Sequence, residues 1–333
     1  MTDLRERFSG FQEQVWVGMR VGFVQDKLCL LWFAMVQFPA LSGLFVKTAL
    51  TGPLITLCVM LLGVELYSLL PVRLSNNLKL LPPPALLPDE VTGAKKVAVL
   101  FPGYGGVDSN TDRIIEEAKK EGVTAICYDW ETYRGNLVRA ANNGISLGSM
   151  LGKQLAASEK IEEVHFIGVS VGSFAANACL EAFASEVEKQ KRGGQRKKFQ
   201  SILRTPESMS SEDDKSEQLP MTRATFLDPF TQKGLFGLGY GIKRFGLRAQ
   251  YAEQYLNTDD PVPSTNEACN HCAVFDITAC KDRDEFIPLP QDNMHSWPAA
   301  FYGMNYHSGR KIGPTLASRS HSLYPRGRVS FVA

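Results

Sequence analysis

The residues of this chain that most suggest chemistry are Gly168 to Gly172, which have the form Gly-x-Ser-x-Gly. They follow the apolar stretch Val164–Ile167 and precede an alanine-rich stretch that is typical of a helix. In this context the two glycines allow a sharp strand-to-helix turn, which lifts the Ser170 hydroxyl above a sheet edge at a helix N-terminus. The pattern therefore predicts that Ser170 is a nucleophile, and a small-residue turn without chemistry is the alternative.

An upstream glycine-rich loop meets a second requirement of acyl transfer, two backbone N–H groups that are aimed at the developing oxyanion. This loop, Pro-Gly-Tyr-Gly-Gly at residues 102–106, ends the apolar stretch Val97–Phe101. We expect one N–H from Val171, the residue after the nucleophile, and the other from Tyr104. An ordinary glycine turn is the alternative for the loop.

The elements that must position Ser170 alternate between strands and helices from Lys95 onward. Such an alternation is typical of a mostly parallel sheet with helices on both faces. We therefore expect an α/β domain over residues 95–307. The predicted elements are strand Val97–Phe101, helix Arg113–Glu121, strand Val123–Tyr128, helix Leu137–Leu155, strand Val164–Ile167 and helix Ser173–Phe183.

On these motifs the chain resembles the α/β-hydrolase superfamily and, within it, the serine lipases and esterases that are similar to pancreatic lipase. Where those lipases have a histidine before the nucleophile, this chain has Val169, and their disulfides are absent. The resemblance implies an α/β-hydrolase fold and the role of triad acid for Asp228. It covers about Val97–Tyr306 and rests on Phe101-Pro102-Gly103-Tyr104-Gly105, Tyr128-Asp129-Trp130, Val164–Gly172 and Phe226-Leu227-Asp228-Pro229.

The base must come after the serine, because the triad order in this fold is serine, acid, histidine. His295 follows the predicted strand Ala273–Thr278 and opens a predicted helix, Trp297–Tyr302, so we assign it as the base. His271 is the alternative, although it precedes that strand and would lie at the wrong end of the sheet. The other three of the five histidines are weaker candidates: His165, His307 and His321.

The triad acid has two main candidates, since a carboxylate must hold the histidine in the correct tautomer. Asp228 stands at the end of a predicted strand and matches the family motif. Asp260 is its rival, because other hydrolases of this fold place the acid one strand later. The sequence around Asp260 also suits a turn, and Asp282 and Asp284 are third candidates.

Composition excludes several classes of protein. The 333 residues carry 36 basic and 35 acidic side chains, a net charge of +1, which excludes a nucleic-acid binder that relies on bulk basicity. An odd number of cysteines, 7, scattered through apolar stretches is no disulfide framework and favours a reducing compartment. Cys269-Asn270-His271-Cys272 lacks a second ligand pair. We therefore expect no metal and no cofactor.

The N-terminal part of the chain is apolar over lengths that suit a membrane. Two runs, Leu28–Val46 and Thr48–Leu70, are each about as long as a helix needs to cross a bilayer, roughly 20 residues. We expect a membrane-embedded helical hairpin over 28–70, with a buried hairpin of a soluble protein as the alternative. Basic residues on both sides of the hairpin favour the cytoplasmic side for both ends.

The remaining segments are assigned by composition. Residues 1–27 are mildly amphipathic, residues 71–94 are a proline-rich linker, and residues 308–333 are a basic tail. The polar stretch 184–222 is expected to be a disordered insertion. Residues 230–251 suit a lid that touches lipid, or an ordinary packed loop and helix.

Together these features predict a serine hydrolase of an intracellular membrane that cleaves a lipid ester. Ser170 attacks, His295 carries the proton and Asp228 orients His295. The expected partners are the lipid bilayer and a lipid ester, and not nucleic acid. The alternative is a catalytically silent subunit with this fold in a membrane protein complex.

Overall fold

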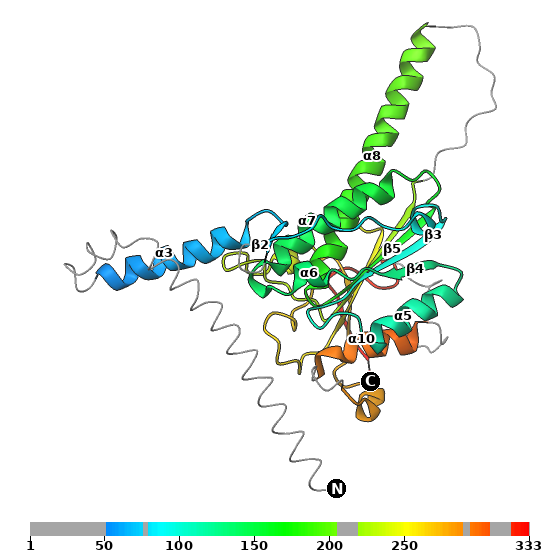
Figure 1. The fold of residues 1–333 in the computed structure, drawn as a ribbon. Coiled ribbons are helices and arrows are strands. Elements are labelled where there is room, and N and C mark those ends of the chain that lie inside the picture. Colours follow the sequence, from blue (N-terminus) through cyan, green and yellow to red (C-terminus); the bar gives the residue numbers. More distant parts are fainter. Residues whose placement is uncertain (1–50, 76–78, 205–218, 289–293, 307–320, 333) are drawn as a thin grey trace.

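The centre of the molecule is a seven-stranded sheet, seen in a computed structural model that describes residues 51–75, 79–204, 219–288, 294–306 and 321–332 (Figure 1). The strand order is β4-β3-β5-β6-β7-β8-β9, and every neighbouring pair is parallel. The prediction of an α/β fold with a parallel sheet is confirmed. The strands are β3 (Lys96–Phe101), β4 (Thr124–Cys127), β5 (Glu163–Val169), β6 (Met221–Leu227), β7 (Tyr251–Leu256), β8 (Ala273–Asp276) and β9 (Val329–Phe331).

Both faces of the sheet are covered by helices, as the near-continuous apolar strands require. Along β3, Val97 and Val99 point to one face and Ala98 and Leu100 to the other, and all four are buried. Only the ends of the strands are therefore open for a site. The first face is covered by α7 (Leu137–Ala156) and α8 (Gly172–Arg204), and the second by α5 (Ser109–Lys120) and α10 (Trp297–Asn305).

Helices α7 and α8 lie unusually close together because α7 presents glycines to α8. A Cβ atom on Gly148 would lie 2.1 Å from the carbonyl oxygen of Ala175, and one on Gly152 would lie 2.2 Å from that of Cys179. Any side chain here would push the helices apart. Since α8 begins directly after Ser170, this contact fixes the direction in which the helix leaves the turn.

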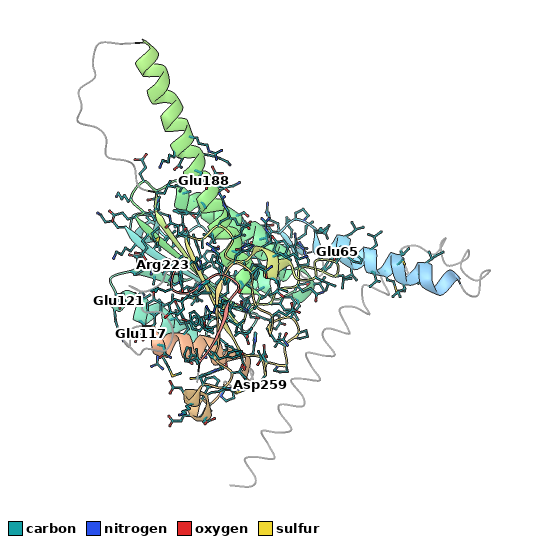
Figure 2. All side chains as sticks on the ribbon, turned by 180° about the vertical axis from the view of Figure 1, so that it is seen from behind. Glu65, Glu117, Glu121, Glu188, Arg223 and Asp259 are labelled. Carbon is teal, nitrogen blue, oxygen red and sulfur yellow. The ribbon has the colours of Figure 1, made fainter. Side chains whose placement is uncertain are left out.

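The apolar run 48–70 forms α3 (Thr51–Ser68), which projects away from the domain (Figure 1). The first run of the predicted hairpin, 28–46, lies outside the described residues. Among the described residues, no helix combines the length and the apolar character needed to cross a bilayer. Figure 2 shows Glu65 near the end of α3 that meets the domain.

The proline-rich linker is fastened to the domain along part of its length. It contains a short antiparallel pair, β1 (Leu74–Ser75) and β2 (Lys79–Leu80), and one helical turn, α4 (Asp89–Thr92). The Gln154 side chain bonds both the N–H and the C=O of Leu87, at 2.9 and 3.0 Å. The predicted proline-rich linker is therefore a strap along α7 and β4.

The polar stretch that was expected to be disordered is partly ordered. Helix α8 continues to Arg204, so the first half of the polar stretch 184–222 is helical, whereas residues 205–218 lie outside the described residues. Its abundant Glu, Lys, Gln and Arg are good helix formers, and Lys189 pairs with Glu186 at 2.8 Å.

The basic tail also takes part in the fold. Its last residues form β9, the edge strand beside β8, and the Arg326 guanidinium donates to three backbone carbonyls, those of Gly246, Ala249 and His271. The sequence predicted only a basic tail here, on the basis of its charge. Three carbonyl acceptors and a strand edge explain the order of this part instead.

Replacing Gly148 with alanine is expected to destabilise the protein by about 1–3 kcal/mol, because its Cβ would collide with backbone and the helices must separate. The matched control is Gly193→Ala on α8, where nothing lies within 4 Å of the added Cβ. That change should stabilise the helix by about 0.5–1 kcal/mol. Thermal unfolding of both variants measures the difference, and equal midpoints would contradict the packing argument.

Candidate active site

The turn at Ser170 is a strained connection between β5 and α8. Ser170 has φ 50°, in the left-handed region that a serine rarely adopts. Glycine is required on both sides, because a Cβ on Gly168 would lie 2.5 Å from the Cα of Ser173. One on Gly172 would lie 2.2 Å from the carbonyl oxygen of Phe101. The expected sharp turn is thus built by backbone contacts that only glycine allows.

Neighbouring backbone holds Ser170 in this conformation. Its N–H donates to the carbonyl oxygen of Leu227 at 3.0 Å, and its own carbonyl accepts from the N–H of Phe230 at 3.1 Å. Both partners flank Asp228 at the end of β6. The conformation costs on the order of 1–3 kcal/mol and persists only where the surroundings determine it, which is typical of functional sites.

The glycine-rich loop after β3 lies against the serine. A Cβ on Gly103 would lie 3.1 Å from the Cβ of Ser170 and 3.8 Å from its Oγ. Trp130 Nε1–H donates to the carbonyl oxygen of Pro102 at 2.9 Å, and Arg134 donates to that of Tyr104 at 2.6 Å. The loop that carries Tyr104 is therefore adjacent to Ser170 and held from both sides.

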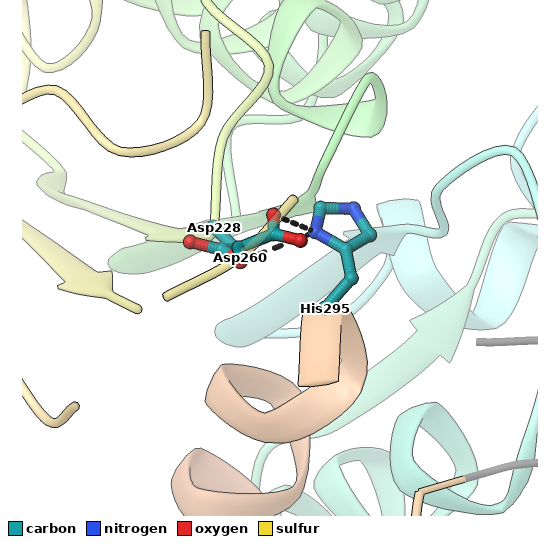
Figure 3. A group of neighbouring side chains, drawn as sticks. All are labelled: Asp228, Asp260 and His295. Carbon is teal, nitrogen blue, oxygen red and sulfur yellow. Dashed lines mark hydrogen bonds and ion pairs between the residues drawn. The ribbon is translucent and has the colours of Figure 1, made fainter. Parts of the chain in front are cut away.

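His295 lies in a short 3-10 turn, η2 (Met294–Ser296), directly before α10. Its Nδ1 lies 3.1 Å from Oδ2 of Asp228 and 2.6 Å from Oδ2 of Asp260 (Figure 3). The two rival acids therefore contact the same ring nitrogen. The sequence offered them as alternatives, and the structure brings both of them to His295.

Each carboxylate is held by its own loop. Asp228 is fully buried with φ 46° and accepts a hydrogen bond from the N–H of Asn257 at 3.2 Å. Asp260 accepts from the N–H of Val262 at 3.1 Å and from the Thr265 hydroxyl at 2.7 Å. More donors reach Asp260, so its negative charge is better compensated than that of Asp228.

The same difference appears in the protonation of the two acids. Burial raises the pKa of Asp228 to about 7, against the opposing effect of His295. For Asp260 burial acts in the same sense, but the hydrogen bond and charge of His295 and the bond from Thr265 outweigh it, and its pKa is lowered. Asp260 is thus the acid of the pair that favours the ionised form, and Asp228 is the one that more readily keeps a proton.

The pKa of His295 responds to both acids. Burial lowers it, but the hydrogen bonds to Asp228 and Asp260 and their negative charges raise it well above its ordinary value. The resting cluster therefore contains an imidazolium between two carboxyl groups. Such coupled groups titrate as a unit rather than as separate residues.

The three ligand atoms of this cluster lie within 4.8 Å of one another, so a metal ion must be considered. Two ligand atoms of one zinc ion lie farther apart than 2.6 Å, since each is about 2.0–2.2 Å from the metal in tetrahedral geometry. The 2.6 Å between Nδ1 of His295 and Oδ2 of Asp260 is the length of a hydrogen bond. The carboxylates therefore hold the His295 ring by hydrogen bonds, and this pair of atoms is too close together to share one zinc ion.

The site residues come after four neighbouring strands of the sheet and lie at the carboxyl ends of these strands. Ser170 follows β5, Asp228 follows β6, Asp260 follows β7 and His295 comes after β8. In the part of the chain that the structure describes, no hydrogen bond joins Ser170 Oγ to His295. Catalytic hydrogen bonds of this kind often tighten only when substrate binds.

The other histidines lie elsewhere. His271 directly precedes β8, at the opposite sheet edge from Ser170, and its carbonyl oxygen accepts from Arg326 at 2.8 Å. His165 lies within β5 and bonds Thr225 at 2.8 Å, His321 accepts from the N–H of Ala252 at 3.1 Å, and His307 is outside the described residues. Asp282 and Asp284 lie in η1 (Lys281–Glu285), apart from the His295 cluster.

Two supporting residues had no predicted role. Arg134, in α6 (Glu131–Arg134), is 8% exposed and holds the Tyr104 carbonyl. Asn257 contacts both sides of the cluster, since its N–H bonds Asp228 and its side chain donates to the carbonyl oxygen of Met294 at 2.9 Å. The signal for Arg134 was its position just after the Tyr128-Asp129-Trp130 motif, whereas Asn257 had none.

Comparison with protein-family models and with curated proteins found no match to this chain. Among solved structures, the chain is similar to a putative hydrolase of the alpha/beta superfamily from Xanthomonas campestris pv. campestris. The two are 14% identical, with a TM-score of 0.32 and coverage of 50% of this chain and 74% of that chain. A likeness at this level carries no argument about the site, which rests on its own geometry.

Histidine titration by NMR tests the cluster without any assay of activity. Asp260→Asn should lower the pKa of His295 more than Asp228→Asn does, because Asp260 is the closer and the more fully ionised partner. The His321 resonance serves as the internal control, and His295→Gln assigns the His295 signal. A pKa of His295 that is unchanged in both variants would show that the carboxylates do not hold its proton.

Proposed function

We propose that this protein is a serine hydrolase with an α/β-hydrolase fold that cleaves a carboxylic ester of a lipid at a membrane. The observation that carries the proposal is the strained Ser170 turn at the same sheet edge as a histidine held by two carboxylates. A nucleophile on a sharp strand-to-helix turn, with a base oriented by an acid, is the arrangement that acyl transfer needs.

In the proposed reaction, Ser170 Oγ attacks the ester carbonyl carbon while His295 Nε2 accepts the hydroxyl proton. The negative charge that develops on the carbonyl oxygen is stabilised by the N–H groups of Val171 and Tyr104. The tetrahedral intermediate then breaks the bond to the alcohol, which leaves with the proton from His295. Water attacks the acyl-serine by the same route and releases the carboxylic acid.

Asp228 and Asp260 both orient and stabilise the His295 ring in this mechanism. Asp260, ionised and 2.6 Å from Nδ1, is the principal partner of the imidazolium that forms during each transfer. Asp228 was the expected acid and contributes the second contact, at 3.1 Å. Both keep the proton on Nδ1, which leaves Nε2 free to face Ser170.

The lipid substrate is proposed from the apolar surface next to the domain. Helix α3 exposes leucines along its length, and such a surface is unstable in water unless membrane or protein covers it. An intracellular membrane, with the catalytic domain on the cytoplasmic side, agrees with the buried free thiols of Cys179, Cys269 and Cys272. A catalytically silent subunit of a membrane complex is the competing function, favoured by the missing hydrogen bond between Ser170 and His295.

A fluorophosphonate probe, which labels activated serines, separates these two functions. The native protein should be labelled and Ser170→Ala should not, because the probe needs the nucleophile and its base. His295→Ala should lose about four to six orders of magnitude in turnover of a short-chain ester. His271→Ala is the matched control and should keep its turnover, since His271 lies at the other sheet edge.

Folded native protein without Ser170-dependent labelling would contradict the hydrolase and favour the silent subunit. A dead but folded His271→Ala beside an active His295→Ala would contradict the assignment of the base.

The pH dependence of kcat/KM follows from the raised pKa of His295. Only the neutral ring can accept the serine proton, so activity should rise with pH, with a half-maximum well above the ordinary value of 6.5. Asp260→Asn removes a negative partner, so it should move the half-maximum to lower pH and reduce the plateau by about 10²–10⁴-fold. A half-maximum that does not move in this variant would argue against Asp260 as the partner of the base.

A further inference from the structure

Helix α3 is apolar on every side. At 100° per residue its exposed large apolar side chains fall on two separate faces, and the apolar Met60 and Val64, which are partly exposed, lie between these faces. A single partner helix or groove covers only one stripe of such a helix, whereas a lipid bilayer surrounds it. The exposed apolar residues of α3 are Ile55, Leu57, Val59, Leu61, Leu62 and Leu66.

The base of α3 is firmly attached to the catalytic domain. Arg139 of α7 is fully buried and donates to the carbonyl oxygens of Leu70 and Pro71 at 2.8 and 2.6 Å. Its guanidinium also lies 5.4 Å from the centre of the Tyr67 ring, whose hydroxyl accepts from Asn136 at 2.8 Å. The direction of α3 is therefore coupled to the domain that carries Ser170.

A second apolar element lies against the base of α3 (Figure 2). Glu65 accepts a hydrogen bond from the backbone N–H of Leu235 at 2.7 Å, and a Cβ on Gly234 would lie 2.6 Å from the same carboxylate. The next side chains of this loop project into solvent, with Phe236 64% exposed and Leu238 70% exposed. Two unpartnered apolar elements thus meet at Glu65.

The loop also reaches the candidate active site. It leaves β6 at Asp228, and the N–H of Phe230 donates to the carbonyl oxygen of Ser170 at 3.1 Å. One short stretch of backbone therefore runs from the nucleophile to Glu65 on α3.

The charges around the loop favour an anionic surface. The segment 233–248 contains no acidic residue. Its C-terminal half includes α9 (Tyr240–Arg244), where Lys243 and Arg244 are exposed. Basic side chains beside apolar ones are attracted to anionic phospholipid headgroups. Of its basic residues, Arg244 and Arg248 pair with Glu181 and Glu188 of α8 at 3.0 and 2.8 Å, so Lys233 and Lys243 carry the charge that is available to headgroups.

We infer that α3 and the segment 233–243 form one surface that docks on an anionic phospholipid bilayer, with Glu65 as the latch that holds the loop against the helix. In this arrangement Phe236 and Leu238 enter the lipid beside α3, and Lys233 and Lys243 contact the headgroups. The inference rests on the proposed membrane association and not on hydrolysis. It brings lipid to the loop that borders Ser170.

Photocrosslinking of the full chain in vesicles tests this surface. Phe236 is replaced by p-benzoylphenylalanine, and the protein is reconstituted in phosphatidylcholine with phosphatidylserine or in phosphatidylcholine alone. The matched control carries the same group at Leu219, an exposed apolar position just before β6 at the opposite sheet edge. Lipid should be captured at position 236 and not at position 219, with several-fold more capture when phosphatidylserine is present.

Three further variants distinguish the role of Glu65 and the proposed hydrolysis from docking on lipid. Glu65→Ala should reduce capture at position 236 several-fold, whereas Glu90→Ala, at an exposed glutamate of α4, should leave it unchanged. Ser170→Ala should capture lipid as the native chain does, so a failure of the proposed hydrolysis cannot imitate a failure of docking.

Equal capture at positions 236 and 219, or capture of protein in place of lipid at 236, would overturn the docking surface. Unchanged capture in Glu65→Ala would overturn the latch.

Discussion

The close approach of three backbone segments at Ser170 is the constraint on which the rest of the site depends. Gly168 is forced against α8 and Gly172 against the end of β3, so the turn fits only when both glycines are present. The N–H and C=O of Ser170 then bond the backbone that leaves β6. Once β3, β5 and β6 are fixed in this way, the loop with Tyr104 and the acid Asp228 have defined positions next to the serine.

Electrostatics determines how the site can hold two carboxylates. Two like charges at one ring nitrogen would repel each other, and burial makes each of them costly. The cluster resolves this because the carboxylates raise the pKa of His295, which favours its positive form, while burial raises the pKa of Asp228, which favours its protonated form. Both shifts reduce the net negative charge that the buried site must hold. Asp260, with hydrogen bonds from Val262 and Thr265, is the acid best suited to stay ionised.

The sequence predicted the α/β alternation because each strand and helix has its own local pattern of apolar residues. It also located Ser170, since its glycines and flanking elements are contiguous in the chain. It could not decide between Asp228 and Asp260, because their common distance to His295 depends on how β6, β7 and β8 lie side by side. The order in the strap 71–94 and in β9 was missed for a similar reason. Gln154 and the edge of β8 stabilise those segments, and both lie far away in the sequence.

The same dependence on distant parts of the chain applies to the loop between β6 and α9. Its composition suited either a lid or an ordinary loop, and only its neighbours distinguish the two. One end is bonded to Ser170 and the other to Glu65 of α3, so a displacement of the loop would act on the nucleophile turn directly. The Glu65 carboxylate accepts the N–H of Leu235 and is only partly buried, so it keeps contact with solvent as well as with the loop. An acidic residue is therefore accommodated at the end of α3 that joins the domain, where the helix leaves its apolar stretch.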